Sequence, residues 1–119
     1  MPKLGDWLEP HPHGIFVRPA DAWVDPSLPQ PRALVTHGHA DHARGGHGAV
    51  WATPETLAIM DTRYGEQAGH PVRYGESVRL GEVEATFVAA GHVLGSAQIL
   101  LEYRGERIVV SGDYKRRPD

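Results

Sequence analysis

The chain has 119 residues, the size of one small domain or of part of a larger one. It has no apolar run of the roughly 18 residues that cross a bilayer, and residues 1–6 lack the apolar core of a signal peptide, so we expect a cytoplasmic protein. The absence of cysteine excludes disulfides, thiolate zinc sites and a cysteine nucleophile within these residues. The net charge of −3 does not indicate nucleic-acid binding, so any such function must be argued from the site.

Prolines punctuate the first third of the chain and keep it out of α-helix. Short extended segments are expected between them at Gly14–Arg18 and Ala22–Asp25. The β-branched, apolar stretch Arg32–Thr36 is a stronger strand candidate, and it runs directly into His37. A further strand is expected at Ala49–Ala52.

One helix is expected in the middle of the chain. Thr53, Pro54 and Glu55 have the residue types of an N-cap, a first-turn proline and a first-turn acid. The helix should run to about Tyr64, because Gly65 suits the position that follows a helix.

The second half of the chain is expected to form two hairpins, with turns at 81–82 and 104–106. Their four strands are Ser77–Leu80, Val83–Ala89, Ala97–Tyr103 and Arg107–Ser111. Strands outnumber the single helix, so the fold class is α/β or α+β. The last strand is followed by residues 112–119 with no closing element, which indicates a chain that covers only part of a fold.

The centre of the sequence is a histidine-rich motif that follows the strand Arg32–Thr36. His37 and His39 are two residues apart, so in extended chain both project to one side and can bind one metal ion. Asp41 and His42 can face a second ion if the chain turns after His39. The alternative is a polar loop whose histidines are solvated, but four residues of metal-ligand type within six positions serve no packing purpose.

Two later residues can complete a two-metal site. His92 and Asp113 each follow an apolar strand, as His37 does. Strand ends on one rim of a sheet converge, and a two-metal site needs a third imidazole and a bridging carboxylate. Taken singly, His92 or Asp113 would more simply have a structural role in a turn. His47, just after the motif, is a weaker candidate for supporting the site.

These motifs resemble those of the metallo-β-lactamase superfamily. The pattern consists of His37-x-His39-x-Asp41-His42, then Gly91-His92 and Gly112-Asp113, with Asp25 at a strand end as the first motif. The sequences around these motifs, at 91–98 and 111–115, resemble those of the β-CASP nuclease branch. Within that branch they most resemble the bacterial ligase-associated DNA exonucleases.

The resemblance implies a ligand set for two ions: His37, His39 and His92 on the first, Asp41 and His42 on the second, and Asp113 bridging both. Asp41 and Asp113 are thereby the expected catalytic residues. Asp25 would support the ligands from behind. Apart from the resemblance, Lys115 belongs to a basic run that could contact a substrate phosphate, although such a run at a chain end is more often a solvated tail.

The resemblance also implies an αββα sandwich, of which we expect residues 1–119 to supply the N-terminal part: a mixed, mostly antiparallel sheet with at least one covering helix. The last metal-two histidine, the β-CASP region and its general-acid histidine would lie beyond Asp119. The 119 residues alone are therefore expected to bind about one ion and to be inactive.

The implied activity is phosphodiester hydrolysis by a water that two metal ions activate, with zinc favoured over manganese or iron. The expected partner is nucleic acid, most simply DNA trimmed from an end, with a functional association with a DNA ligase and no membrane. Three alternatives stay open: an RNA 3′-end processing nuclease, a small-molecule metallohydrolase of the same superfamily, and a non-catalytic metal-binding module.

Overall fold

A computed structural model of the chain describes residues 6–36, 46–89 and 97–111. These residues form ten strands, one α-helix and a short 3-10 helix. In chain order they are β1 (Leu8–His11), β2 (Gly14–Val17), η1 (Arg18–Ala20), β3 (Ala22–Val24), β4 (Arg32–Leu34), β5 (Ala49–Ala52), α1 (Pro54–Tyr64), β6 (Gly69–Pro71), β7 (Ser77–Leu80), β8 (Val83–Ala89), β9 (Ala97–Tyr103) and β10 (Glu106–Ser111).

The strands belong to two sheets. One has six strands in the order β1-β2-β3-β4-β5-β6, antiparallel from β1 to β3 and parallel from β3 to β6. The other has four antiparallel strands in the order β10-β9-β8-β7. The mixed, mostly strand-built architecture agrees with the prediction, but the expectation that this part of the chain supplies only one sheet is wrong. Local sequence patterns locate strands without showing which of them pair.

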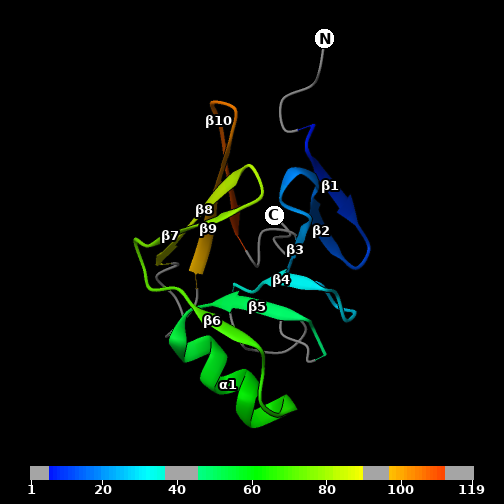
Figure 1. Cartoon of the computed structure of the whole chain (residues 1–119), viewed down its shortest axis with the longest axis vertical. Coiled ribbons are helices and arrows are strands. Elements are labelled where there is room, and N and C mark those ends of the chain that lie inside the picture. The colour runs from blue at the N-terminus through cyan, green and yellow to red at the C-terminus, as the bar shows by residue number, and fades with distance from the viewer. Residues whose placement is uncertain (1–5, 37–45, 90–96, 112–119) are drawn as a thin grey trace, which may run out of the picture.

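The elements stack in three layers, with α1 on one face of the six-stranded sheet and the four-stranded sheet on the other (Figure 1). The three apolar residues at positions 33–35, in and directly after β4, contact both neighbouring layers. Ala33 and Val35 pack in the cluster beneath α1, whereas Leu34 packs in the core between the sheets. A strand buried on both faces carries no polar alternation.

Helix α1 has the predicted boundaries. The Thr53 hydroxyl accepts a hydrogen bond from the Thr56 amide at 3.2 Å, which satisfies one of the helix's unpaired amides. The amide of Gly65, the C-cap, donates to the Asp61 carbonyl. With 11 residues, α1 is too short to cross a membrane, and no other helix of the described ranges qualifies.

Two strands were not predicted from the sequence, and one turn differs. Strand β1 contains Pro10 and lies at a sheet edge, where a missing amide is tolerated. Strand β6 has only three residues, all exposed, so it carries no apolar pattern. The second hairpin turns at Arg104–Gly105, both with positive φ, and Glu106 already belongs to β10.

Candidate metal centre

Three segments that carry predicted ligands leave the sheets at neighbouring points. In the four-stranded sheet Ala89, the last residue of β8, pairs with Ala97, the first residue of β9. Ser111, the last residue of β10, pairs with Gln98. Segments 90–96 and 112–119 therefore both begin at the same end of this sheet.

Asp25 closes β3 and supports the point where β4 ends. Its carboxylate accepts two hydrogen bonds from Thr36, one from the amide and one from the hydroxyl, both at 2.8 Å. Both residues are buried. The Asp25 amide in turn donates to the Leu34 carbonyl at 2.8 Å. Because β3 and β4 run parallel, their ends lie on one rim, and Asp25 fixes the peptide that immediately precedes His37.

Thr36 also connects the two sheets. Its carbonyl accepts a hydrogen bond of 2.7 Å from the amide of Ala97. Thr36 directly precedes His37. Ala97 directly follows segment 90–96, which contains His92. The start of the first histidine motif and the end of the second are thus held together by Thr36.

The predicted ligands themselves lie outside the described residues. These are His37, His39, Asp41, His42, His92 and Asp113, and the predicted phosphate contact Lys115 lies outside them as well. Within ranges 6–36, 46–89 and 97–111 no group of three or more histidine, aspartate or glutamate side chains could hold a metal ion. Of the predicted site residues, Asp25 and the weaker candidate His47 fall in these ranges, and Asp25 directly follows the last residue of β3.

His47 anchors the chain just after segment 37–45. It is buried, and its Nδ1 accepts a hydrogen bond from the Gln30 amide at 3.1 Å. The Gly48 amide donates to the Gln30 carbonyl at 2.9 Å. A neutral ring that accepts at Nδ1 carries its proton on Nε2. His47 therefore ties the exit of the histidine motif to the loop between β3 and β4.

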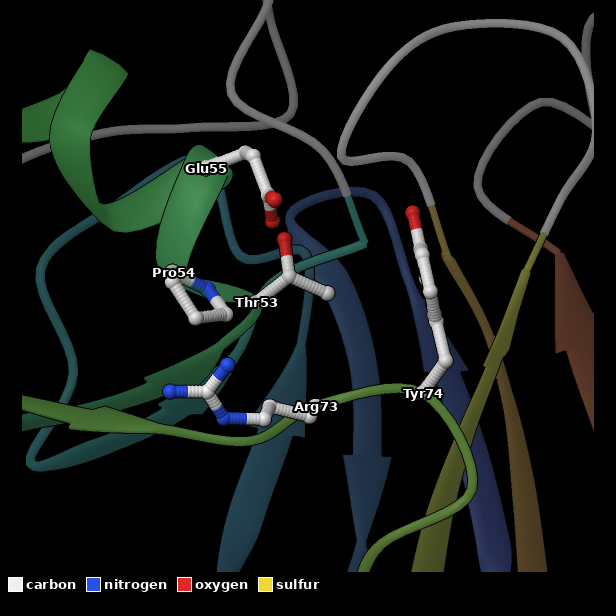
Figure 2. A pocket seen from close by; sticks show the side chains of 5 residues that line it. All are labelled: Thr53, Pro54, Glu55, Arg73 and Tyr74. Atoms are coloured by element: carbon white, nitrogen blue, oxygen red, sulfur yellow. The ribbon is translucent and has the colours of Figure 1, made fainter.

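A pocket of about 260 Å³ opens beside this rim, at the ends of β5 and β6 (Figure 2). It is lined by Thr53, Pro54, Glu55, Arg73 and Tyr74. The sequence patterns did not indicate Arg73 or Tyr74 as functional, and Glu55 suggested only solvated charge. Their position just after strands could have indicated a site. However, β6 is short and exposed, so its sequence does not reveal that it pairs with β5.

Comparison with known proteins agrees with the motif analysis, although no protein-family model matches the chain. A protein named "Probable DNA ligase" from Opitutus terrae is 33% identical over 115 residues, which cover 93% of this chain and 11% of that protein. Ribonuclease TTHA0252 from Thermus thermophilus is 34% identical over 111 residues, covering 71% of this chain and 26% of the relative. The chain therefore spans only a small part of these relatives.

Solved structures support the fold. A metallo-β-lactamase variant from Cronobacter sakazakii superposes with a TM-score of 0.60 at 18% identity, over 86% of this chain and 54% of that one. The three layers described above are thus those of a metallo-β-lactamase fold. Fold and sequence together relate the chain to the metallo-β-lactamase superfamily of hydrolases and, within it, to the β-CASP nucleases.

Proposed function

We propose that the chain is the N-terminal part of a metal-dependent phosphodiester hydrolase, a DNA exonuclease of the ligase-associated β-CASP type. The observation that carries the proposal is the hydrogen-bonded junction of Asp25, Thr36 and Ala97. It joins the peptide before the first histidine motif to the peptide after the second. A fixed junction of this kind is what a metal site needs in order to orient ligands from two segments.

The chemistry of the donors fits two divalent ions. Imidazole and carboxylate ligands suit zinc, and manganese and iron accept the same set. In this proposal His37, His39 and His92 hold one ion, Asp41 and His42 hold the other, and Asp113 contacts both. Bound ions would lower the pKa of a water molecule and stabilise the attacking and leaving oxygens of a phosphodiester. Asp25 holds Thr36, and Lys115 contacts a substrate phosphate.

The substrate class rests on the relatives. One is named as a DNA ligase and another as a ribonuclease, so both point to nucleic acid and leave DNA and RNA as competing substrates. We favour DNA because the motif sequences resemble those of the ligase-associated branch and because the relative named as a DNA ligase matches 93% of this chain. A role beside a ligase in DNA repair, in the cytoplasm, belongs to the same proposal.

The test is hydrolysis of end-labelled single-stranded DNA and RNA by the full-length protein supplied with zinc or manganese. We expect stepwise release of mononucleotides from DNA. Asp113→Ala should reduce the activity to background, because its carboxylate is the proposed bridge between the ions. Asp119→Ala is the matched control, an aspartate of the same segment that the proposal does not use. Faster cleavage of RNA would favour the RNA-processing alternative.

A small-molecule metallohydrolase is the second candidate, because the superposed structure is a metallo-β-lactamase. Hydrolysis of thioesters or lactones with no cleavage of either nucleic acid would establish it in place of the nuclease. Metal binding with no hydrolysis of any of these substrates would indicate a non-catalytic module. For the 119 residues alone we expect about one bound ion and no nuclease activity.

A further inference from the structure

The pocket at the ends of β5 and β6 lies close to the start of the histidine motif. In the parallel part of the six-stranded sheet Leu34 pairs with Trp51, so the same register places Thr36 level with Thr53. Ala52 pairs with Pro71 on the next strand, and Arg73, two residues after the end of β6, lines the pocket together with Pro54. Neighbouring strands are about 4.8 Å apart. The pocket therefore begins about one strand spacing from the residue that precedes His37.

The side chains of the pocket combine a cation, an aromatic ring and an acid. Arg73 is exposed, and its guanidinium makes no ion pair with another residue of the described ranges. Tyr74 is 43% exposed, although large apolar side chains are usually more buried than this. Figure 2 shows Glu55 and Thr53 on one side of the pocket, Tyr74 on the other, and Arg73 beside Pro54.

The start of helix α1 forms part of the pocket wall, but the proposed binding does not use the backbone amides of the helix. The Thr53 hydroxyl is already used by the Thr56 amide, so the available chemistry is that of the side chains. The Glu55 carboxylate would repel a small free anion that filled the pocket. A nucleotide suits both charges, because its phosphate can lie on Arg73 while its base, which carries N–H donors, faces Tyr74 and Glu55.

We propose that this pocket receives the single-stranded end of a nucleic acid, with a backbone phosphate on Arg73 and a base stacked on Tyr74. Arginine and an exposed aromatic ring are the pair of contacts that sequence-independent single-strand binding uses. The inference rests on the proposed function, which it deepens by naming the residues that hold the strand next to the metal site.

The test is binding of a fluorescent, nuclease-resistant phosphorothioate single strand to the full chain, measured by anisotropy over a range of salt concentrations. Arg73→Ala should weaken binding about 10-fold and reduce the slope of log affinity against log salt by about 0.7, the loss of one phosphate contact. Tyr74→Ala should weaken binding about 10-fold with the slope unchanged, because stacking releases no counterion. Arg73→Lys and Tyr74→Phe should keep most of the affinity.

The chain offers a matched control in Arg63 and Tyr64, an adjacent arginine and tyrosine at the other end of α1. The Arg63 guanidinium lies over the Tyr64 ring at 5.5 Å, and both side chains are exposed. An 11-residue helix separates this pair from the pocket by about 16 Å. Arg63→Ala and Tyr64→Ala should bind the strand as the wild type does.

Two outcomes would overturn the inference: equal affinity losses in the Arg63 and Arg73 variants, or release of the strand by excess inorganic phosphate at constant ionic strength, which would identify a simple anion site. Failure of the proposed function gives a different result. In that case the full-length protein hydrolyses no nucleic acid, while the comparison of the two arginine variants still decides whether the pocket holds a strand.

Discussion

At the scale of single residues, the buried hydrogen bonds between Asp25 and Thr36 stabilise the fold next to the proposed site. Both carboxylate oxygens accept a hydrogen bond from a residue that is completely buried. Hydrogen bonds to a charged acceptor contribute about 1.5–3 kcal/mol each, and an unpaired buried donor is destabilising by a similar amount. Asp25 also has φ of 50°, a conformation that aspartate tolerates better than most residues.

Asp25→Ala should lower the free energy of unfolding by about 2–5 kcal/mol, because the Thr36 amide and hydroxyl lose their acceptors. It should also weaken zinc binding about 10- to 100-fold, the usual effect of removing a support behind metal ligands. Asp25→Asn, which keeps one acceptor oxygen, should lose less of both. Urea denaturation and competition titration against a chromophoric chelator measure the two effects.

Asp21→Ala is the control for these variants. Asp21 has φ of 52° but is exposed, so its replacement tests the backbone conformation without buried hydrogen bonds. If Asp21→Ala destabilises the chain as much as Asp25→Ala does, the Thr36 bonds are not the cause. Wild-type zinc affinity in folded Asp25→Ala would remove its role behind the ligands.

The sequence predicts some of these residues and not others for a physical reason. Asp25 could be found because an aspartate at a strand end is a local pattern. The hydrogen bond from the Ala97 amide to the Thr36 carbonyl joins two sheets across 61 positions of sequence, and no local pattern indicates it. Arg73 and Tyr74 were missed for the same reason, since their place beside Thr53 depends on the pairing of β5 with β6.

At the scale of elements, the two hairpins of the four-stranded sheet differ in what their turns contact. Gly81, in the turn between β7 and β8, has φ of +60°, and a Cβ built there would lie 2.2 Å from the Pro19 carbonyl oxygen. Gly105, in the turn between β9 and β10, has φ of +82° and nothing within 4 Å of such a Cβ. The turn between β7 and β8 packs against η1, which connects β2 and β3 of the six-stranded sheet. The turn between β9 and β10 has free space around the position of a Gly105 Cβ.

Gly105→Ala should therefore lower the free energy of unfolding by about 1 kcal/mol, the backbone penalty alone. Gly81→Ala should lower it by about 2–4 kcal/mol, because the backbone of η1 or of the turn must also shift. Chemical denaturation of both variants measures the difference. Equal losses would show that the contact between Gly81 and Pro19 does not hold the sheets together.

Elements with a strong local signal were predicted well. Helix α1 and strands β5, β7, β8 and β9 have the expected boundaries, because capping residues, glycine turns and apolar runs mark them. Strands β1 and β6 were missed, since β1 contains a proline and β6 is short and exposed. Their positions are set by neighbouring strands, which is a tertiary effect that propensity does not contain.

At the scale of the whole molecule, the layers determine where the strands that lead into segments 37–45, 90–96 and 112–119 end. Leu34 of β4 packs in the core between the two sheets. The hydrogen bond from the Ala97 amide to the Thr36 carbonyl joins the two sheets at this end. The His-x-His-x-Asp-His motif predicts a metal site, and the structure places Thr36, the residue before this motif, beside Ala97, the residue after segment 90–96. The number of sheets was not predictable, because it depends on long-range pairing alone.

The most direct test of this account is a crystal structure of the protein grown with zinc, with an anomalous difference map recorded at the zinc absorption edge. We expect anomalous peaks beside Thr36 and Ala97, with nitrogens of His37, His39 and His92 and an oxygen of Asp113 about 2.0–2.2 Å from the ions. Zinc bound only elsewhere, or a His92 side chain more than about 10 Å from that of His37, a separation that two ligands of one ion cannot have, would contradict it.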